Sequence, residues 1–158
     1  MKQLSVHSVT TPRDILKYIL ESYSHIMSYI GNIENLVHRN DNFREVVFTG
    51  HKSQLVVMSI PVSTEVGEEI HEHVEQTLYI VSGVCKVILD SEEHIVSGGD
   101  VVVVTPNTKH NFINVGEEVV KIITTYSPPN HIDGRVHATK EAADADTEDE
   151  NFGHQYTS

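Results

Sequence analysis

The chain has 158 residues, of which 39% are hydrophobic, and a formal net charge of −12 from 23 acidic and 11 basic residues. This balance argues against nucleic acid and against anionic membrane surfaces as partners, because both require a basic patch. The single cysteine, Cys85, excludes an internal disulfide and suits a reducing compartment. We find no secretory signal and no apolar run long enough to span a bilayer, so we expect a cytoplasmic protein with one domain.

The first predicted element is a helix that begins at Thr11 and Pro12. Threonine is a favourable N-cap, and proline suits the first helical position. Apolar residues then recur every three or four positions between residues 15 and 37, and Gly31-Asn32 ends or kinks the helix. We expect residues 1–40 to form an N-terminal helical extension whose apolar stripe packs against the domain or against a second subunit.

From residue 43 the hydrophobic period changes to that of short strands. Segments rich in Val, Ile, Thr and aromatic residues alternate with glycines and polar turns, and we predict strands at 43–48, 54–60, 77–82, 85–89, 94–96, 101–104, 111–114 and 119–126. Many short strands with regular turn signals are typical of a sandwich or small barrel.

The predicted barrel covers residues 41–128. It ends at Pro128-Pro129, because proline offers no amide donor for strand pairing. Residues 129–158 are predicted to be a C-terminal extension. Its acidic run, residues 141–150, is interpreted as a solvated, mobile tail in preference to an interaction segment.

The most informative stretch lies between residues 67 and 83. His71 and His73 are two positions apart, and in a strand such residues point to one face, where both imidazoles can bind one ion. Gln76 or Glu75 would add an oxygen ligand, and His110 a third nitrogen if the fold brings it back. In a chain with 11 histidines, the alternative is an incidental pair.

Two stretches together resemble the motifs of the cupin superfamily. The first motif is matched by Gly67, His71, His73, Gln76 and Gly83, and the second by Gly99, Thr105, Asn107, His110 and Asn114, where Thr105 and Asn107 replace the usual proline and glycine. The gap between His73 and Gln76 is one or two residues shorter than the superfamily norm, and Gln76 replaces the usual glutamate. The resemblance is closest to small single-domain cupins, covers about residues 43–140, and in such cupins the second histidine position is often acidic.

The resemblance implies a mainly β fold, the cupin double-stranded β-helix or jelly-roll barrel, with the two motif regions facing each other inside it. It implies a divalent metal ion (Fe, Mn, Ni, Zn or Cu) held by His71, His73, Gln76 and His110, with Glu75 as a substitute for Gln76. The pocket beside the metal is expected to be lined by Leu78, Ile80 and Phe112. We assign no catalytic residue, and His131 and His137 are not placed in the site.

Three functions stay open from the sequence. The first is a metal-dependent enzyme that acts on a small polar molecule, with oxygenase-like or isomerase-like chemistry. The second is a non-catalytic module that binds a metal or a small ligand. The third is a dimeric scaffold with an empty site. Small cupins commonly form homodimers, and the apolar stripe of the N-terminal helix would widen such an interface.

Overall fold

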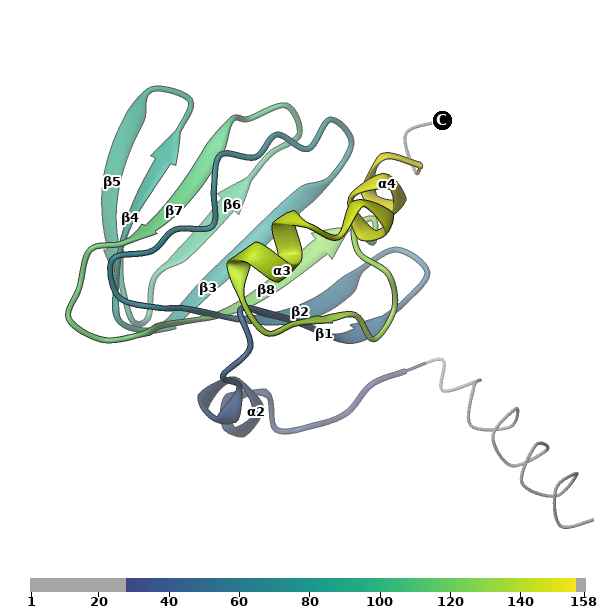
Figure 1. The fold of residues 1–158 in the computed structure, drawn as a ribbon, viewed down its shortest axis with the longest axis horizontal. Coiled ribbons are helices and arrows are strands. Elements are labelled where there is room, and N and C mark those ends of the chain that lie inside the picture. The colour runs from purple at the N-terminus through teal and green to yellow at the C-terminus, as the bar shows by residue number, and fades with distance from the viewer. Residues whose placement is uncertain (1–27, 156–158) are drawn as a thin grey trace, which may run out of the picture. The chain divides into compact units, whose positions relative to one another are not determined.

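The computed structural model of the chain describes residues 28–155 (Figure 1). The predicted N-terminal helix lies mostly outside the described residues, so its apolar stripe stays a prediction. Gly31–Ser158 form one compact unit, which contains every helix and strand described. Within residues 28–155, no helix combines the length and the apolar character that crossing a bilayer requires.

Helix α2 (Ile33–Arg39) begins where the sequence suggested the end or kink of a longer helix. Asn32 is its N-cap, since its side-chain oxygen accepts a hydrogen bond of 2.9 Å from the backbone N–H of Asn35. The helix buries Val37, which is fully shielded from solvent. Asn40 ends the helix and leads the chain into the first strand.

Nine strands follow within residues 28–155, and all eight predicted strands are confirmed to within two residues at each end. They are β1 (Arg44–Thr49), β2 (Gln54–Ile60), β3 (Glu75–Ser82), β4 (Val84–Leu89), β5 (Glu92–Ser97), β6 (Val101–Val104), β7 (His110–Asn114), β8 (Val120–Ser127) and β9 (Val136–His137). The ninth, β9, was not predicted, because a strand of two residues carries no alternating pattern. It pairs with β1.

The strands form two antiparallel sheets that face each other (Figure 1). The larger sheet has the order β6-β3-β8-β2-β1-β9, and the smaller has the order β5-β4-β7. Alternate residues of both sheets point inward, as in β8, and they form one hydrophobic cluster that includes Leu78, Ile80, Val87, Phe112 and Ile122. The mainly β prediction and the predicted barrel architecture are therefore confirmed.

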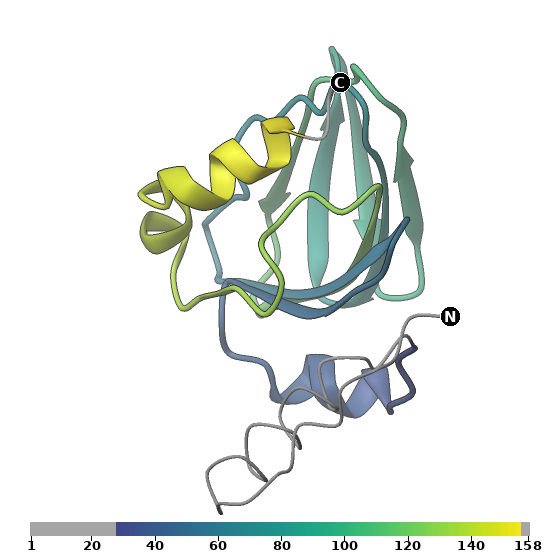
Figure 2. The same ribbon diagram turned by 90° about the vertical axis from the view of Figure 1, so that its right-hand side faces the viewer.

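Two helices follow β9 in the segment where the sequence suggested a solvated tail. They are α3 (Lys140–Asp144) and α4 (Thr147–Gln155), and Figure 2 shows them in yellow beside the barrel. Thr139 caps α3, because its hydroxyl oxygen accepts from the backbone N–H of Ala142 at 3.2 Å. The acidic run, residues 141–150, is thus part of two helices, whereas we expected a solvated, mobile tail.

Charge pairing explains this difference. The Arg135 side chain lies 2.9 Å from Asp146 and 2.7 Å from Glu148, and Asp149 is only 2% exposed. One oxygen of Asp149 accepts a hydrogen bond of 2.7 Å from the backbone N–H of Ile132. Carboxylates that look solvated in the sequence therefore find cationic and N–H partners in the preceding segment.

Gln54 on β2 fixes the chain that leaves the barrel after β8. Its side chain is buried, and its Nε2 atom donates to the backbone oxygen of His131 at 2.7 Å and to Thr49 Oγ1 at 2.8 Å. Its Oε1 atom accepts from the backbone N–H groups of Asn130 and His131, at 3.2 and 3.0 Å. A single buried amide therefore holds the backbone of His131 in place.

We expect Gln54→Leu to lower the free energy of unfolding by about 2–4 kcal/mol, because each buried polar group left without a partner costs roughly 1–3 kcal/mol. Thr49→Val is the matched control, since it removes one acceptor of the same amide and leaves the backbone bonds intact. Urea unfolding of both variants measures the difference. Equal stability of Gln54→Leu and the wild type would contradict this role.

Candidate metal centre

The chain between β2 and β3 runs antiparallel to β7. The backbone N–H of Glu69 donates to the oxygen of His110, and the N–H of His110 donates to the oxygen of Glu69, both at 2.9 Å. Residues that exchange both hydrogen bonds lie directly opposite each other, and their side chains project from the same face of the ladder. The backbone pairing between the two segments therefore places the side chains of Glu69 and His110 next to each other on one face.

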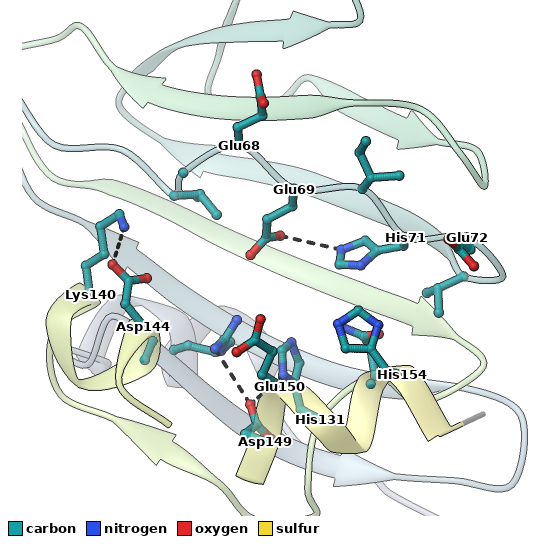
Figure 3. Close-up of a pocket in the computed structure, with 18 of the residues that line it drawn as sticks. Glu68, Glu69, His71, Glu72, His131, Lys140, Asp144, Asp149, Glu150 and His154 are labelled. Atoms are coloured by element: carbon teal, nitrogen blue, oxygen red, sulfur yellow. Dashed lines mark hydrogen bonds and ion pairs between the residues drawn. The ribbon is translucent and has the colours of Figure 1, made fainter. Parts of the chain in front are cut away.

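His71 joins this pair because it lies two positions after Glu69 in extended chain, on the same face. Its Nε2 atom is 3.4 Å from Oε2 of Glu69, and Nε2 of His110 is 3.9 Å from the same oxygen. The ligand atoms of the three residues lie within 4.8 Å of one another. In Figure 3, Glu69 and His71 point toward each other, and both lie on the upper wall of a cavity.

The two imidazoles are oriented as metal-binding histidines commonly are. Nδ1 of His110 lies 2.8 Å from the backbone oxygen of Thr108, so Nδ1–H donates and Nε2 keeps its lone pair. The Nε2 atoms of His71 and His110 are buried, and within residues 28–155 neither has a polar partner other than the Glu69 carboxylate. Two orphaned nitrogen donors beside a carboxylate are a donor set that fits a divalent ion of the first transition row.

The protonation states suit the same role. Burial favours a neutral Glu69, but His71 and the charges of Arg44 and His110 outweigh it and hold the pKa of Glu69 at about 2. Burial lowers the pKa of His110, against the opposing effects of the Thr108 carbonyl and of Glu69. A carboxylate that is ionised and an imidazole that is neutral are the forms that bind metal.

His73 does not join the cluster. A bend at Glu72 and His73 follows His71, and the His73 side chain lines the cavity without reaching the cluster. The His73 side chain is 51% exposed, and its Nε2 atom lies 3.8 Å from the Glu72 carboxylate. Glu75, at the start of β3, is exposed as well. Neither side chain lies in the group formed by Glu69, His71 and His110.

Gln76 is buried, and it projects into the barrel from β3. Its Nε2 atom donates to Thr124 Oγ1 at 3.2 Å, while its Oε1 atom is buried without a partner. Gln76 pairs across the sheet with Tyr126, and the Tyr126 ring lies 6.0 Å from that of His71. An unpaired amide oxygen therefore lies on the strand beside the cluster.

The three residues predicted to line the pocket lie in the hydrophobic core instead and do not line the cavity beside the cluster. Leu78, Ile80 and Phe112 are at most 1% exposed and belong to the hydrophobic cluster. The ring of Phe112 contacts that of His110, with 6.3 Å between centroids. Phe112 therefore supports His110 from the interior of the barrel.

The sequence analysis missed Glu69, although one signal pointed to it. The gap between His73 and Gln76 was too short for the first cupin motif. The pair Glu69 and His71 lies two residues earlier on the same face, and it leaves four residues before Gln76. The short gap between His73 and Gln76 thus indicated that the pair facing His110 lies two residues earlier, at Glu69 and His71.

The cluster opens into a cavity of about 650 Å³. The chain between β2 and β3 forms one wall, and the C-terminal segment with α3 and α4 forms another (Figure 3). Six carboxylates line the cavity, against one arginine and one lysine. This balance favours cations and neutral polar molecules over polyanions.

Comparison with known proteins agrees with this architecture. The family model described as "Cupin domain" matches residues 56–126. The crystal structure of BH2720 from Bacillus halodurans has a TM-score of 0.75 and 32% identity, and the match covers 77% of this chain and 96% of that chain. The chain therefore belongs to the cupin superfamily, as a small, single-domain cupin with the jelly-roll fold.

Two further relatives carry names that state no activity. YrkC from Bacillus subtilis is 36% identical over 118 residues, which are 71% of this chain and 63% of YrkC. MJ1618 from Methanocaldococcus jannaschii is 29% identical over 126 residues, which are 77% of this chain and 96% of MJ1618. This chain thus spans less than two thirds of YrkC.

The depressed pKa of Glu69 makes a prediction for the metal-free protein. The ionised carboxylate contributes stability that is complete above its unfolded value of 4.5 and is lost as the pH falls toward its folded value of about 2. We expect the stability advantage of the wild type over Glu69→Gln to shrink between pH 5 and pH 2. Urea unfolding across this range measures it, with Glu68→Gln as the exposed control. An advantage independent of pH would contradict the assignment.

Proposed function

We propose that this cupin binds a divalent metal ion through Glu69, His71 and His110, and that it acts on a small polar molecule in the adjoining cavity. The convergence of two buried Nε2 atoms, which have no other polar partner among the described residues, on one Glu69 oxygen carries this proposal. Two histidines and one carboxylate are the donor set of non-haem Fe(II) oxygenases, and Mn, Ni, Zn and Cu also accept these ligands. Gln76 is the proposed fourth ligand.

A divalent ion with open positions supplies a Lewis acid for a substrate oxygen or a site for O₂. The chain's own residues supply the remaining functions. Thr108 holds His110 in the tautomer that presents Nε2, and the packed barrel beneath the histidines excludes water from one side. The six carboxylates of the cavity disfavour a sugar phosphate and favour a neutral or cationic substrate.

We expect the purified, untagged protein to bind one equivalent of metal after reconstitution. Glu69→Ala and His71→Ala should each lose it, because each removes a ligand of the cluster. His73→Ala is the matched control and should keep it, because its nitrogen atoms lie outside the cluster. Elemental analysis after gel filtration measures the ratio. Retention by Glu69→Ala with loss by His73→Ala would instead support the ligand set inferred from sequence.

Turnover separates an enzyme from a binding module. Gln76 stands where a glutamate is usual and removes one carboxylate base, which keeps a non-catalytic ligand-binding role as the second candidate. We expect the metal-loaded protein to convert small hydroxylated or carbonyl compounds, with loss of activity in His71→Ala. Saturable binding of such compounds without conversion would favour the second candidate. Failure to bind any metal would favour a scaffold.

We further propose that the protein is a cytoplasmic homodimer. On the outer face of the larger sheet, Tyr79, Val101 and Val103 are 43–60% exposed, and Tyr79 pairs directly with Val101 across β3 and β6. Such a cluster of exposed apolar side chains is typical of an interface. We expect a dimeric mass in sedimentation experiments at micromolar concentration, and a shift toward monomer in Val103→Lys. A monomeric wild type would contradict the proposal.

A further inference from the structure

A buried histidine and aspartate form a second polar group in the cavity. His131 follows β8, and Gln54 fixes its backbone. Asp149 on α4 places its Oδ2 atom 2.8 Å from Nδ1 of His131, while its Oδ1 atom accepts the N–H of Ile132 at 2.7 Å. Asp149 is 2% exposed and His131 is 5% exposed, so this contact is shielded from water.

The contact determines which nitrogen of His131 carries the proton. An ionised carboxylate only accepts hydrogen bonds, so a neutral His131 donates from Nδ1 and keeps its lone pair on Nε2. That Nε2 atom is buried, and no described residue hydrogen-bonds with it. A buried acceptor without a partner costs free energy unless a ligand satisfies it. His131 is therefore built to receive a proton or a hydrogen bond.

His131 and the metal cluster share the cavity. Both His131 and His71 line it, and both rings contact the ring of Tyr126, with centroid separations of 4.9 and 6.0 Å. In Figure 3 the His131 ring lies between Asp149 and the Glu69–His71 pair. A small molecule held at the cluster can thus reach His131.

The titratable and charged groups around His131 come from four parts of the chain. They are Arg44 on β1, Tyr126 on β8, Asp149 on α4 and Glu69 before β3. Burial lowers the pKa of His131, Asp149 opposes this effect, and Arg44 lowers the pKa further. The imidazole is therefore neutral at pH 7, with its lone pair available.

We propose that His131, positioned by Asp149, accepts a proton from an acidic O–H group of a small ligand bound at the metal centre. The proton passes from the ligand oxygen to Nε2, the ligand remains as its anion, and the imidazolium is stabilised by the Asp149 carboxylate. The ligand class is small molecules with an ionisable hydroxyl group, such as enols, catechols and hydroxamic acids. The proposal rests on the metal site proposed above. Only the charge and tautomer of His131 are independent of that site.

The first test uses the metal-free, full-length protein. Long-range ¹H–¹⁵N NMR at pH 7 should show a neutral His131 with its proton on Nδ1. In Asp149→Asn the amide oxygen stays with the N–H of Ile132, so the NH₂ group faces Nδ1 and should move the proton to Nε2. Glu150→Gln, an exposed neighbour on the same helix, should behave like the wild type. A charged His131, or a proton on Nε2 in the wild type, would overturn the proposal.

The second test counts protons with acetohydroxamic acid, which gives up one proton when it chelates a metal. Calorimetry of the Zn²⁺-loaded protein at pH 7, in buffers of low and high ionisation enthalpy, gives the number released. We expect His131→Gln to release about one proton more than the wild type, and the exposed-site control His154→Gln to match the wild type. Equal release by wild type and His131→Gln, or no binding of the probe to loaded protein, would overturn the proposal. A protein that takes up no Zn²⁺ would refute the metal site instead, and the NMR result would still decide the state of His131.

Discussion

The reciprocal backbone hydrogen bonds between Glu69 and His110 are the constraint on which the site depends. They join two segments that are 41 positions apart, and they set the register of the irregular chain between β2 and β3. Because the side-chain period of extended chain is two, a slip of one residue would turn both Glu69 and His71 away from His110. The geometry of the cluster is therefore a consequence of main-chain pairing, and the packed barrel beneath it keeps that pairing in place.

Acidic side chains near the C-terminal end of the described residues hold that segment against the barrel through ion pairs. Asp146 is paired with Arg135 and His137. Asp149 is paired with His131 and lies 3.7 Å from Arg44. These partners offset the repulsion between the two carboxylates. The pairs hold α4 over the cavity with little apolar burial. A helix held in this way depends on buried hydrogen bonds and charges, so its docking is specific in register.

The sequence predicted the barrel well, because its strands carry the signals that determine them locally. Short runs rich in β-branched and aromatic residues, separated by glycines or polar turns, mark β1 to β8, and each signal lies within the segment it describes. The cluster that could hold a metal was harder to predict, because His73 and Glu69 both lie two positions from His71 and both fit the strand period. What separates them is the bend at residues 72–73 and the pairing with β7, and both depend on contacts that are distant in sequence. The folding of α4 escaped prediction for the same reason, since its partners lie on β1 and after β8.

The division of roles in the cavity follows from its charges. Glu69 is held ionised by His71 and Arg44, with a pKa of about 2, so it is a poor base at neutral pH and a good ligand. Gln76 cannot act as a base, since an amide does not ionise. His131 has a neutral ring, an unpartnered Nε2 atom and a carboxylate behind it, which is the arrangement that proton transfer requires. If the proposed metal site is correct, an amide at Gln76 in place of the usual carboxylate is matched by a proton acceptor, His131, across the cavity, where Asp149 on α4 and Gln54 position it.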